Sequence, residues 1–190
     1  MYRYWRQHVW YYRAGWKSRV RPSKLIIRKI TNLQLSYKFL DHATDAIIEV
    51  NAKDLKEAFA VAADAEINLT LDQDKVEEKD KKEFSANGKD VRYLLFSWLE
   101  EIPFVLITEG FAIKRIEFDI EENNGYKINA TAYGEPLDVK KHNFKVEIKA
   151  PTFYDMEIRE DDGVYMRFLL DLWILWRILC KSLEQIIRVF

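Results

Sequence analysis

Hydrophobic residues recur at helical spacing in two segments of the chain, and an aspartate precedes each segment. Asp54 comes before the first, and Glu57 three residues later completes a capping-box-like pair. The apolar stripe of this segment contains Leu55, Ala58, Phe59, Ala62, Ala63 and Leu69. Asp90 precedes the second segment, whose stripe contains Val91, Leu94, Leu95, Trp98, Leu99 and Ile102. Pro103 should kink or end the second helix, because its ring clashes with a carbonyl of the preceding turn.

Alternation of apolar and polar residues predicts β-strands on both sides of these helices. The predicted extended segments are residues 24–30, 33–40, 46–50, 75–86, 111–120, 126–133, 145–149, 153–159 and 164–170. Asn123-Asn124-Gly125 is typical of a hairpin turn, and Asp161-Asp162-Gly163 marks another. Residues 75–86 are rich in Lys and Glu, which suits a sheet edge. The pattern predicts an α+β fold, with two helices packed on one face of a mostly antiparallel sheet.

The distribution of tryptophan divides the chain into three parts. Of the 6 tryptophans, only Trp98 lies within residues 37–172. This break predicts one folded domain at 37–172, an N-terminal arm at 1–36 and a C-terminal segment at 173–190.

Charge follows the same division. Residues 1–36 carry nine Lys and Arg residues and no acid, and residues 173–190 carry a net charge of +2. The whole chain has a net charge of −1, so flanks at +9 and +2 leave −12 for residues 37–172. Such an acidic body repels the phosphates of RNA. It suits a basic protein surface, with which electrostatic attraction speeds encounter.

The N-terminal arm interleaves cationic and aromatic side chains. Its aromatic residues are Tyr2, Tyr4, Trp5, Trp10, Tyr11, Tyr12 and Trp16. One interpretation is a disordered arm or an extension that does not belong to the native protein. The alternatives are contact with single-stranded RNA, through phosphates and stacked bases, and contact with an anionic membrane surface.

The C-terminal segment has the pattern of an amphipathic helix. Its apolar face comprises Trp173, Trp176, Leu179, Cys180, Leu183, Ile186, Ile187 and Phe190. Such a face most often packs on its own domain or mediates self-association.

The cysteine content and the hydropathy of the chain indicate in which cellular compartment the protein is expected. Cys180 is the only cysteine, which excludes an intrachain disulfide and suits a reducing cytosol. No apolar run reaches the length of about 18 residues that a membrane span needs. The first 17 residues mix Arg with Tyr and Trp, unlike a secretory signal. We therefore expect a cytoplasmic protein.

Two sets of side chains carry groups suited to metal binding or acid–base catalysis. Asp41, Asp45 and Asp171 lie at the ends of predicted strands, where carboxylates supply oxygen ligands to hard cations such as Ca²⁺ and Mg²⁺. The alternative is that they are solvated turn residues. No His and Cys cluster has the spacing of a zinc site.

The second set is Glu135, His142 and Lys149, which have the groups of a general acid–base set. The simpler interpretation is a polar turn followed by an exposed strand face. The serines have no nucleophile-elbow context, and the glycines form no phosphate-binding loop. The sequence therefore favours a protein that is not itself an enzyme.

The stretch Tyr133–Met156 reads YGEPLDVKKHNFKVEIKAPTFYDM. Together with Asp41-His42-Ala43-Thr44-Asp45 upstream and Asp171-Leu172 downstream, it resembles the archease family over roughly residues 37–172. Archeases are small proteins that activate the tRNA-splicing RNA ligase. The resemblance implies a protein cofactor in tRNA splicing that promotes guanylylation of the ligase and restores multiple turnover.

The resemblance also implies site residues. Asp45 and Asp171 would bind a divalent cation, expected to be Ca²⁺ with Mg²⁺ or Mn²⁺ as alternatives, and Leu172 would contribute an oxygen. The residues implied to contact the ligase are Asp41, His42, Glu135, His142 and Lys149.

This sequence departs from the family pattern at four places. Ala43 and Thr44 stand in exchanged order, and Pro151 and Tyr154 replace an aliphatic residue and a frequent His. The chain also continues beyond Leu172, where archeases normally end with a carboxylate. Two other functions stay open: a small RNA-binding accessory protein that uses the basic arm, and a metal-dependent hydrolase.

Overall fold

A computed structural model describes residues 27–29, 36–41 and 45–173. Two α-helices, α1 (Leu55–Thr70) and α2 (Val91–Pro103), carry the two predicted apolar stripes. The strands in chain order are β1 (Ile27–Lys29), β2 (Ser36–Asp41), β3 (Asp45–Ala52), β4 (Asp80–Gly88), β5 (Phe111–Glu122), β6 (Tyr126–Pro136), β7 (Glu147–Asp161) and β8 (Gly163–Trp173). A 3-10 turn, η1 (Gln73–Lys75), precedes β4, and a π-turn, η2 (Phe104–Thr108), follows α2.

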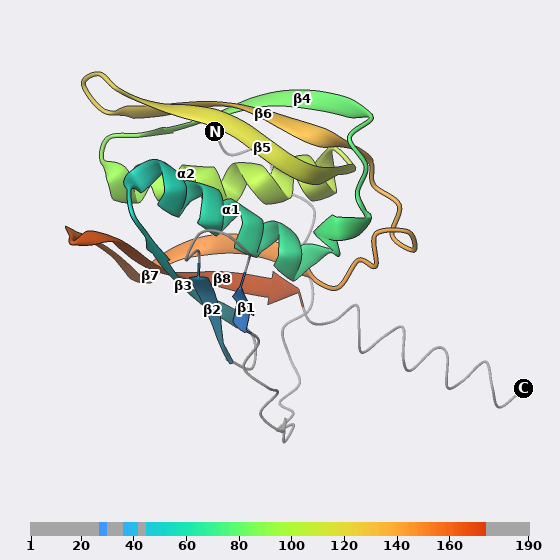
Figure 1. The fold of residues 1–190 in the computed structure, drawn as a ribbon, viewed down its shortest axis with the longest axis horizontal. Helices are drawn as coiled ribbons and strands as arrows, with labels where there is room; N and C mark the ends of the chain where they lie inside the picture. Colours follow the sequence, from blue (N-terminus) through green and yellow to red (C-terminus); the bar gives the residue numbers. More distant parts are fainter. Residues whose placement is uncertain (1–26, 30–35, 42–44, 174–190) are drawn as a thin grey trace, which may run out of the picture.

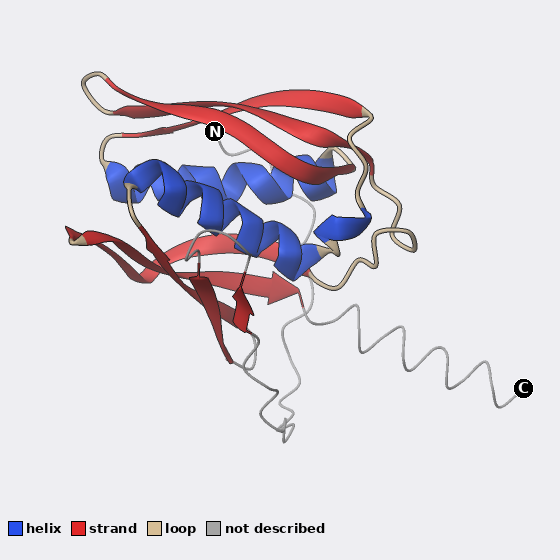
Figure 2. Cartoon of the chain, viewed as in Figure 1, coloured by secondary structure: helices blue, strands red, loops and turns tan. Residues whose placement is uncertain are grey.

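The elements form three layers, with the two helices between two antiparallel sheets (Figures 1 and 2). One sheet has five strands in the order β1-β2-β3-β8-β7, and the other has three in the order β4-β6-β5. This arrangement confirms the predicted α+β class with antiparallel strands and two helices. The strands are divided between two sheets, so that both faces of the helix layer are covered.

Trp98 of α2 lies at the centre of the core and is fully buried. Its Nε1 donates a hydrogen bond to the carbonyl of Phe59 in α1, at 3.1 Å. Its ring stacks on Phe84 of β4 at a centroid distance of 5.4 Å and lies 4.9 Å from Phe118 of β5. One side chain thus joins both helices to the three-stranded sheet, and its polar N–H is satisfied.

The helix boundaries follow from local chemistry. Asp54 accepts a hydrogen bond from the backbone N–H of Glu57 at 2.8 Å, and Asp90 accepts one from the N–H of Tyr93 at 3.0 Å. Both predicted N-caps are therefore confirmed. The α-helical segment of α2 ends at Pro103, as predicted, and the backbone continues as the π-turn η2.

Two strand predictions differ from the structure. The edge strand predicted at 75–86 is observed as Asp80–Gly88, and it follows η1, where Nε2 of Gln73 donates to the Lys114 carbonyl at 2.9 Å. The segments predicted at 145–149 and 153–159 form one strand, β7, with two irregularities in its pairing with β8. Pro151 is tolerated within β7 because this strand lies at the edge of its sheet.

The predicted arm overlaps the five-stranded sheet. Residues 27–29 form β1 and pair with Ser36–Lys38 of β2, so this part of the range 1–36 belongs to the sheet. Most of the predicted C-terminal helix lies outside the described residues, and Trp173 is the last residue of β8. Among the described residues, no helix is long and apolar enough to cross a membrane.

Candidate functional site

Two predicted site residues meet across the central strands of the five-stranded sheet. Asp45 at the start of β3 is the direct partner of Asp171 near the end of β8. The next residues along each strand, Ala46 and Leu170, are buried in the core beneath the helices. Because side chains alternate along a strand, Asp45 and Asp171 project together from the face that points away from the helices.

Lys149 of β7 lies beside Asp171. Its Nζ lies 3.9 Å from Oδ2 of Asp171 and 5.7 Å from the centroid of the Trp173 ring. The pairing of β7 with β8 shifts between Ile148 and Ala150, and Lys149 lies at this shift. Both side chains are nearly half exposed, so solvent screens the ion pair and it adds little to stability. We refer to Asp45, Asp171 and Lys149 as the carboxylate cluster.

The carboxylate cluster brings charged side chains together at one end of the five-stranded sheet. Like charges directly opposite one another on neighbouring strands destabilise the pairing. A cation beside them, such as the Lys149 ammonium, offsets that cost. The described residues contain no group of three or more His, Cys, Asp or Glu side chains placed to hold a metal ion. Leu172 pairs with Ile148 and packs against the core.

Glu135 and His142 form a different structure at the other sheet. Glu135 lies near the end of β6 and is 5% exposed, and His142 lies in the following loop and is fully buried. Glu135 accepts hydrogen bonds from Nζ of Lys141 at 2.6 Å and from Nζ of Lys79 at 2.9 Å. It also accepts one from the backbone N–H of Glu77 at 3.0 Å. These bonds, those of Lys141 and Lys79 foremost, hold the pKa of Glu135 well below its ordinary value of 4.5.

The imidazole of His142 has a partner on each nitrogen. Nδ1 accepts the backbone N–H of Asp138 at 3.0 Å, so the ring proton is on Nε2. Nε2 then donates to Oε1 of Glu135 at 3.1 Å. A neutral imidazole satisfies both bonds, and His142 therefore fixes the loop to the end of β6.

This geometry corrects the acid–base set proposed from the sequence. Lys149 lies beside Asp171 on the five-stranded sheet, whereas Glu135 belongs to the three-stranded sheet. The simpler interpretation fits the turn and the exposed Lys149 of β7, but Glu135 and His142 are buried rather than solvated. A buried His142 offers no side-chain surface to a partner, so any effect of this pair on a ligase would act through the loop.

Two further residues predicted to contact the ligase, Asp41 and His42, lie at or beyond the margin of the described structure. The backbone of Asp41 ends β2 and pairs with Ala46, close to the start of β3. His42 lies outside the described residues. The roles of Asp41, His42 and Lys149 as ligase contacts stay predictions.

The lysines that hold the loop 137–146 in place were not predicted from the sequence. Besides Lys79 and Lys141, Lys145 donates to the carbonyls of Asn68 and Leu71 at the end of α1, at 2.9 and 3.1 Å. Its Nζ also lies 2.7 Å from Asp72. The partners of Lys79 and Lys145 are far away along the chain, so no local pattern could reveal these contacts.

Another acidic side chain lies in the core without such partners. Glu66 of α1 is fully buried, and neither of its carboxyl oxygens has a hydrogen-bond partner among the described residues. Burial raises its pKa well above the ordinary 4.5, since an unpaired charge is costly in an apolar environment. The protonated, neutral form is therefore favoured in the folded protein.

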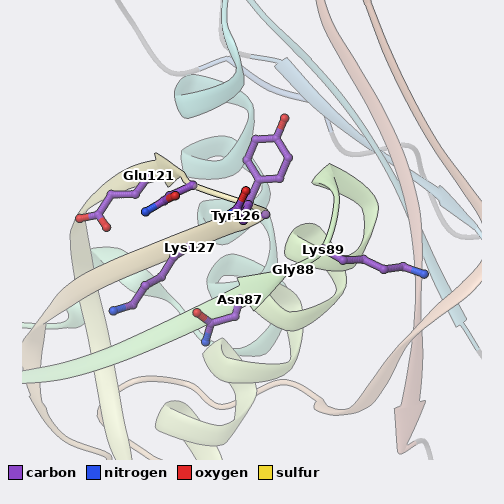
Figure 3. Close-up of a pocket in the computed structure, with 9 residues that line it drawn as sticks. Asn87, Gly88, Lys89, Glu121, Tyr126 and Lys127 are labelled. Carbon is purple, nitrogen blue, oxygen red and sulfur yellow. The ribbon is translucent and has the colours of Figure 1, made fainter.

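A surface hollow of about 520 Å³ lies between the β4–α2 connection and the β5–β6 hairpin. Its lining includes Lys89, Lys127 and Glu121. Figure 3 shows the side chains of Lys89 and Lys127 pointing away from one another. The charged groups do not converge on a common point, and we assign no ligand to this hollow.

Comparison with known proteins agrees with the fold. The profile of the Archease protein family matches residues 37–172. A protein archease of Pyrobaculum islandicum is 40% identical over 134 residues, which cover 70% of this chain and 91% of the relative. That of Pyrococcus abyssi is 37% identical over 136 residues, with 70% and 96% covered. The solution structure of protein 1598 from Methanobacterium thermoautotrophicum matches with a TM-score of 0.59 and 31% identity, and covers 72% of this chain and 98% of that one.

The fold and the cluster define a small α+β protein in which two antiparallel sheets enclose a helix layer and one sheet presents paired carboxylates at its end. The family profile, the relatives and the solved structure each match about 70% of the chain. The chain belongs to the archease family. This confirms the resemblance that the Tyr133–Met156 stretch and the two aspartate motifs indicated.

Replacing Glu135 by Gln should cost stability at neutral pH, because an amide has no charge to offer Lys79 and Lys141. The pKa of Glu135 is lowered in the folded protein. As the pH falls below 4.5, the unfolded state therefore takes up the proton first, and wild type loses stability relative to the variant. Denaturant unfolding of both proteins across this range should show a difference that shrinks with acidification.

Glu66→Gln is the matched control, because the stability difference between wild type and this variant should change with pH in the opposite direction. The pKa of Glu66 is raised in the folded protein, so above pH 4.5 the unfolded state loses the proton first. Wild type should then lose stability relative to Glu66→Gln as the pH rises. A difference for Glu135→Gln that does not change with pH would show that its carboxyl is not held ionised by the two lysines.

Proposed function

We propose that this protein is a protein cofactor that activates the tRNA-splicing RNA ligase, by promoting guanylylation of the ligase and restoring its multiple turnover. Membership of the archease family supports this proposal. The observation that carries it is the direct pairing of Asp45 with Asp171, with Lys149 beside them, on a face that the helices leave uncovered. Charged groups gathered at a sheet end are suited to act within a partner's active site.

The charge of the domain supports docking on a basic protein surface. Residues 37–172 carry a net charge of −12, which favours rapid encounter with a protein whose active site binds RNA and is therefore basic. The same charge opposes direct binding of the domain to RNA. We infer that the protein organises the active site of the ligase and supplies no catalytic residue for a reaction of its own.

We also propose that Asp45 and Asp171 hold a divalent cation. The structure supplies two carboxylates on neighbouring strands, and Leu172 supplies a carbonyl rather than a terminal carboxylate because Trp173 follows it. Two carboxylates suit a cation that keeps much of its water, as Mg²⁺ does, better than one that requires a complete protein cage. When bound, such a cation neutralises the pair and can polarise phosphate oxygens.

Titration calorimetry with Mg²⁺ and with Ca²⁺ tests the cation proposal. Wild type should bind, and Asp171→Asn should lose binding because one of the two carboxylates is removed. Asp119→Asn is the matched control, since Asp119 is an exposed carboxylate of the other sheet that pairs with Lys56 of α1. Unchanged binding by Asp171→Asn would contradict the assignment.

Ligation assays with the cognate ligase test the proposed function. Amounts of this protein below those of the ligase should convert single-turnover ligation to multiple turnover, and Asp45→Asn should abolish the gain while Asp119→Asn retains it. No gain with wild type would refute the proposal. RNA affinity carried by the basic arm, which falls steeply with salt, would favour the RNA-binding alternative instead.

A further inference from the structure

Strand β7 contains a large bulge beside α2. Between Thr152 and Glu157, the strand advances five residues while its partner β8 advances only from Leu169 to Arg167. The surplus residues leave the ladder, and Asp155 adopts a left-handed backbone conformation with a φ of 56°. Bulges of this kind redirect side chains and recur at functional edges of sheets.

The bulge is held on both sides. The ring of Phe153 stacks on Phe96 of α2 at a centroid distance of 4.3 Å, and it lies 4.9 Å from the ring of Tyr93. On the other side, Oδ2 of Asp155 lies 2.7 Å from Nη2 of Arg167 in β8. These contacts fix the residue between them, Tyr154.

Tyr154 projects outward from this support. The backbone N–H of Tyr154 donates to Oγ1 of Thr152 at 3.1 Å, while its side chain is 75% exposed. No other large hydrophobic side chain in the described residues is as exposed. An aromatic side chain on a fixed backbone loses little conformational entropy on binding, which is typical of the residues that anchor protein interfaces.

We propose that Tyr154 anchors this protein on a basic surface of the RNA ligase, an inference that rests on the function proposed above. Strand β7 has a net charge of −3, with five acidic and two basic residues, so the surface around Tyr154 is complementary to a basic partner. Tyr154 is also continuous with the carboxylate cluster, because Lys149 lies five residues earlier on the same strand. At the rise of a strand this spans roughly 17 Å at most.

Two other occupants fit the surface less well. Stacking of RNA bases on Tyr154 would bring phosphates against an acidic strand, which repels them. A second copy of this chain would place two strands of net charge −3 edge to edge. A basic protein surface has neither cost.

The test is the affinity for the ligase, measured by titration with wild type and Tyr154→Ala. The variant should bind about tenfold more weakly or worse, as loss of an interface anchor does. Phe104→Ala is the matched control, because Phe104 is an exposed aromatic residue outside β7 and should leave the affinity unchanged. Equal melting temperatures of Tyr154→Ala and wild type establish that the fold is retained.

The concentration dependence of ligase activation separates docking from chemistry. Tyr154→Ala should reach the full activation of wild type at a higher concentration, whereas Asp45→Asn should bind as wild type does and not activate. If wild type activates and Tyr154→Ala binds equally well, the anchor is wrong and the proposed function stands. If wild type neither binds nor activates, both are wrong. Self-association that Tyr154→Ala abolishes would assign the surface to a second copy and overturn the proposal.

Discussion

The antiparallel pairing of β3 with β8 determines which side chains of the five-stranded sheet face the core and which face away from it. It joins an early strand to the last one, from Asp45 opposite Asp171 to Ala52 opposite Val164. One face of this ladder supplies Ile48, Val50, Met166 and Phe168 to the core beneath the helices. The opposite face therefore receives the two aspartates, and a register shift of one residue would exchange the faces. Core packing and presentation of the carboxylates thus depend on the same hydrogen-bonded register.

The protein places its acidic side chains in three distinct environments. Glu135 is buried but receives two lysines, a backbone N–H and an imidazole, so it is held ionised and ties the loop to the sheet. Glu66 is buried without partners among the described residues, and burial favours its neutral form. Asp45 and Asp171 lie opposite each other on neighbouring strands, and Asp171 is nearly half exposed with Lys149 beside it. Of the three environments, only that of Asp45 and Asp171 leaves the carboxylates partly exposed.

The sequence predicted those features that neighbouring residues encode. Both helices, their N-caps at Asp54 and Asp90 and the turn at Asn123-Asn124-Gly125 follow from local spacing and turn chemistry. Periodicity identifies a strand but not its partner, which is why the division into two sheets was not predicted. The sequence grouped Asp45 with Asp171 as candidate ligands at strand ends, and the family resemblance favoured this over solvated turn residues. Grouping Lys149 with Glu135 and His142 failed because nearness along the chain does not indicate which sheet a residue joins.

The most direct measurement of the central claim is the rate at which the ligase becomes covalently guanylylated when GTP is supplied. Wild-type protein should accelerate appearance of the modified ligase, whereas Asp171→Asn, present at a concentration that saturates binding, should not. This result would show that the paired carboxylates act in the nucleotide-transfer step rather than in docking. Equal acceleration by wild type and Asp171→Asn would contradict the account, because the pairing of β3 with β8 would then present carboxylates that have no part in activation.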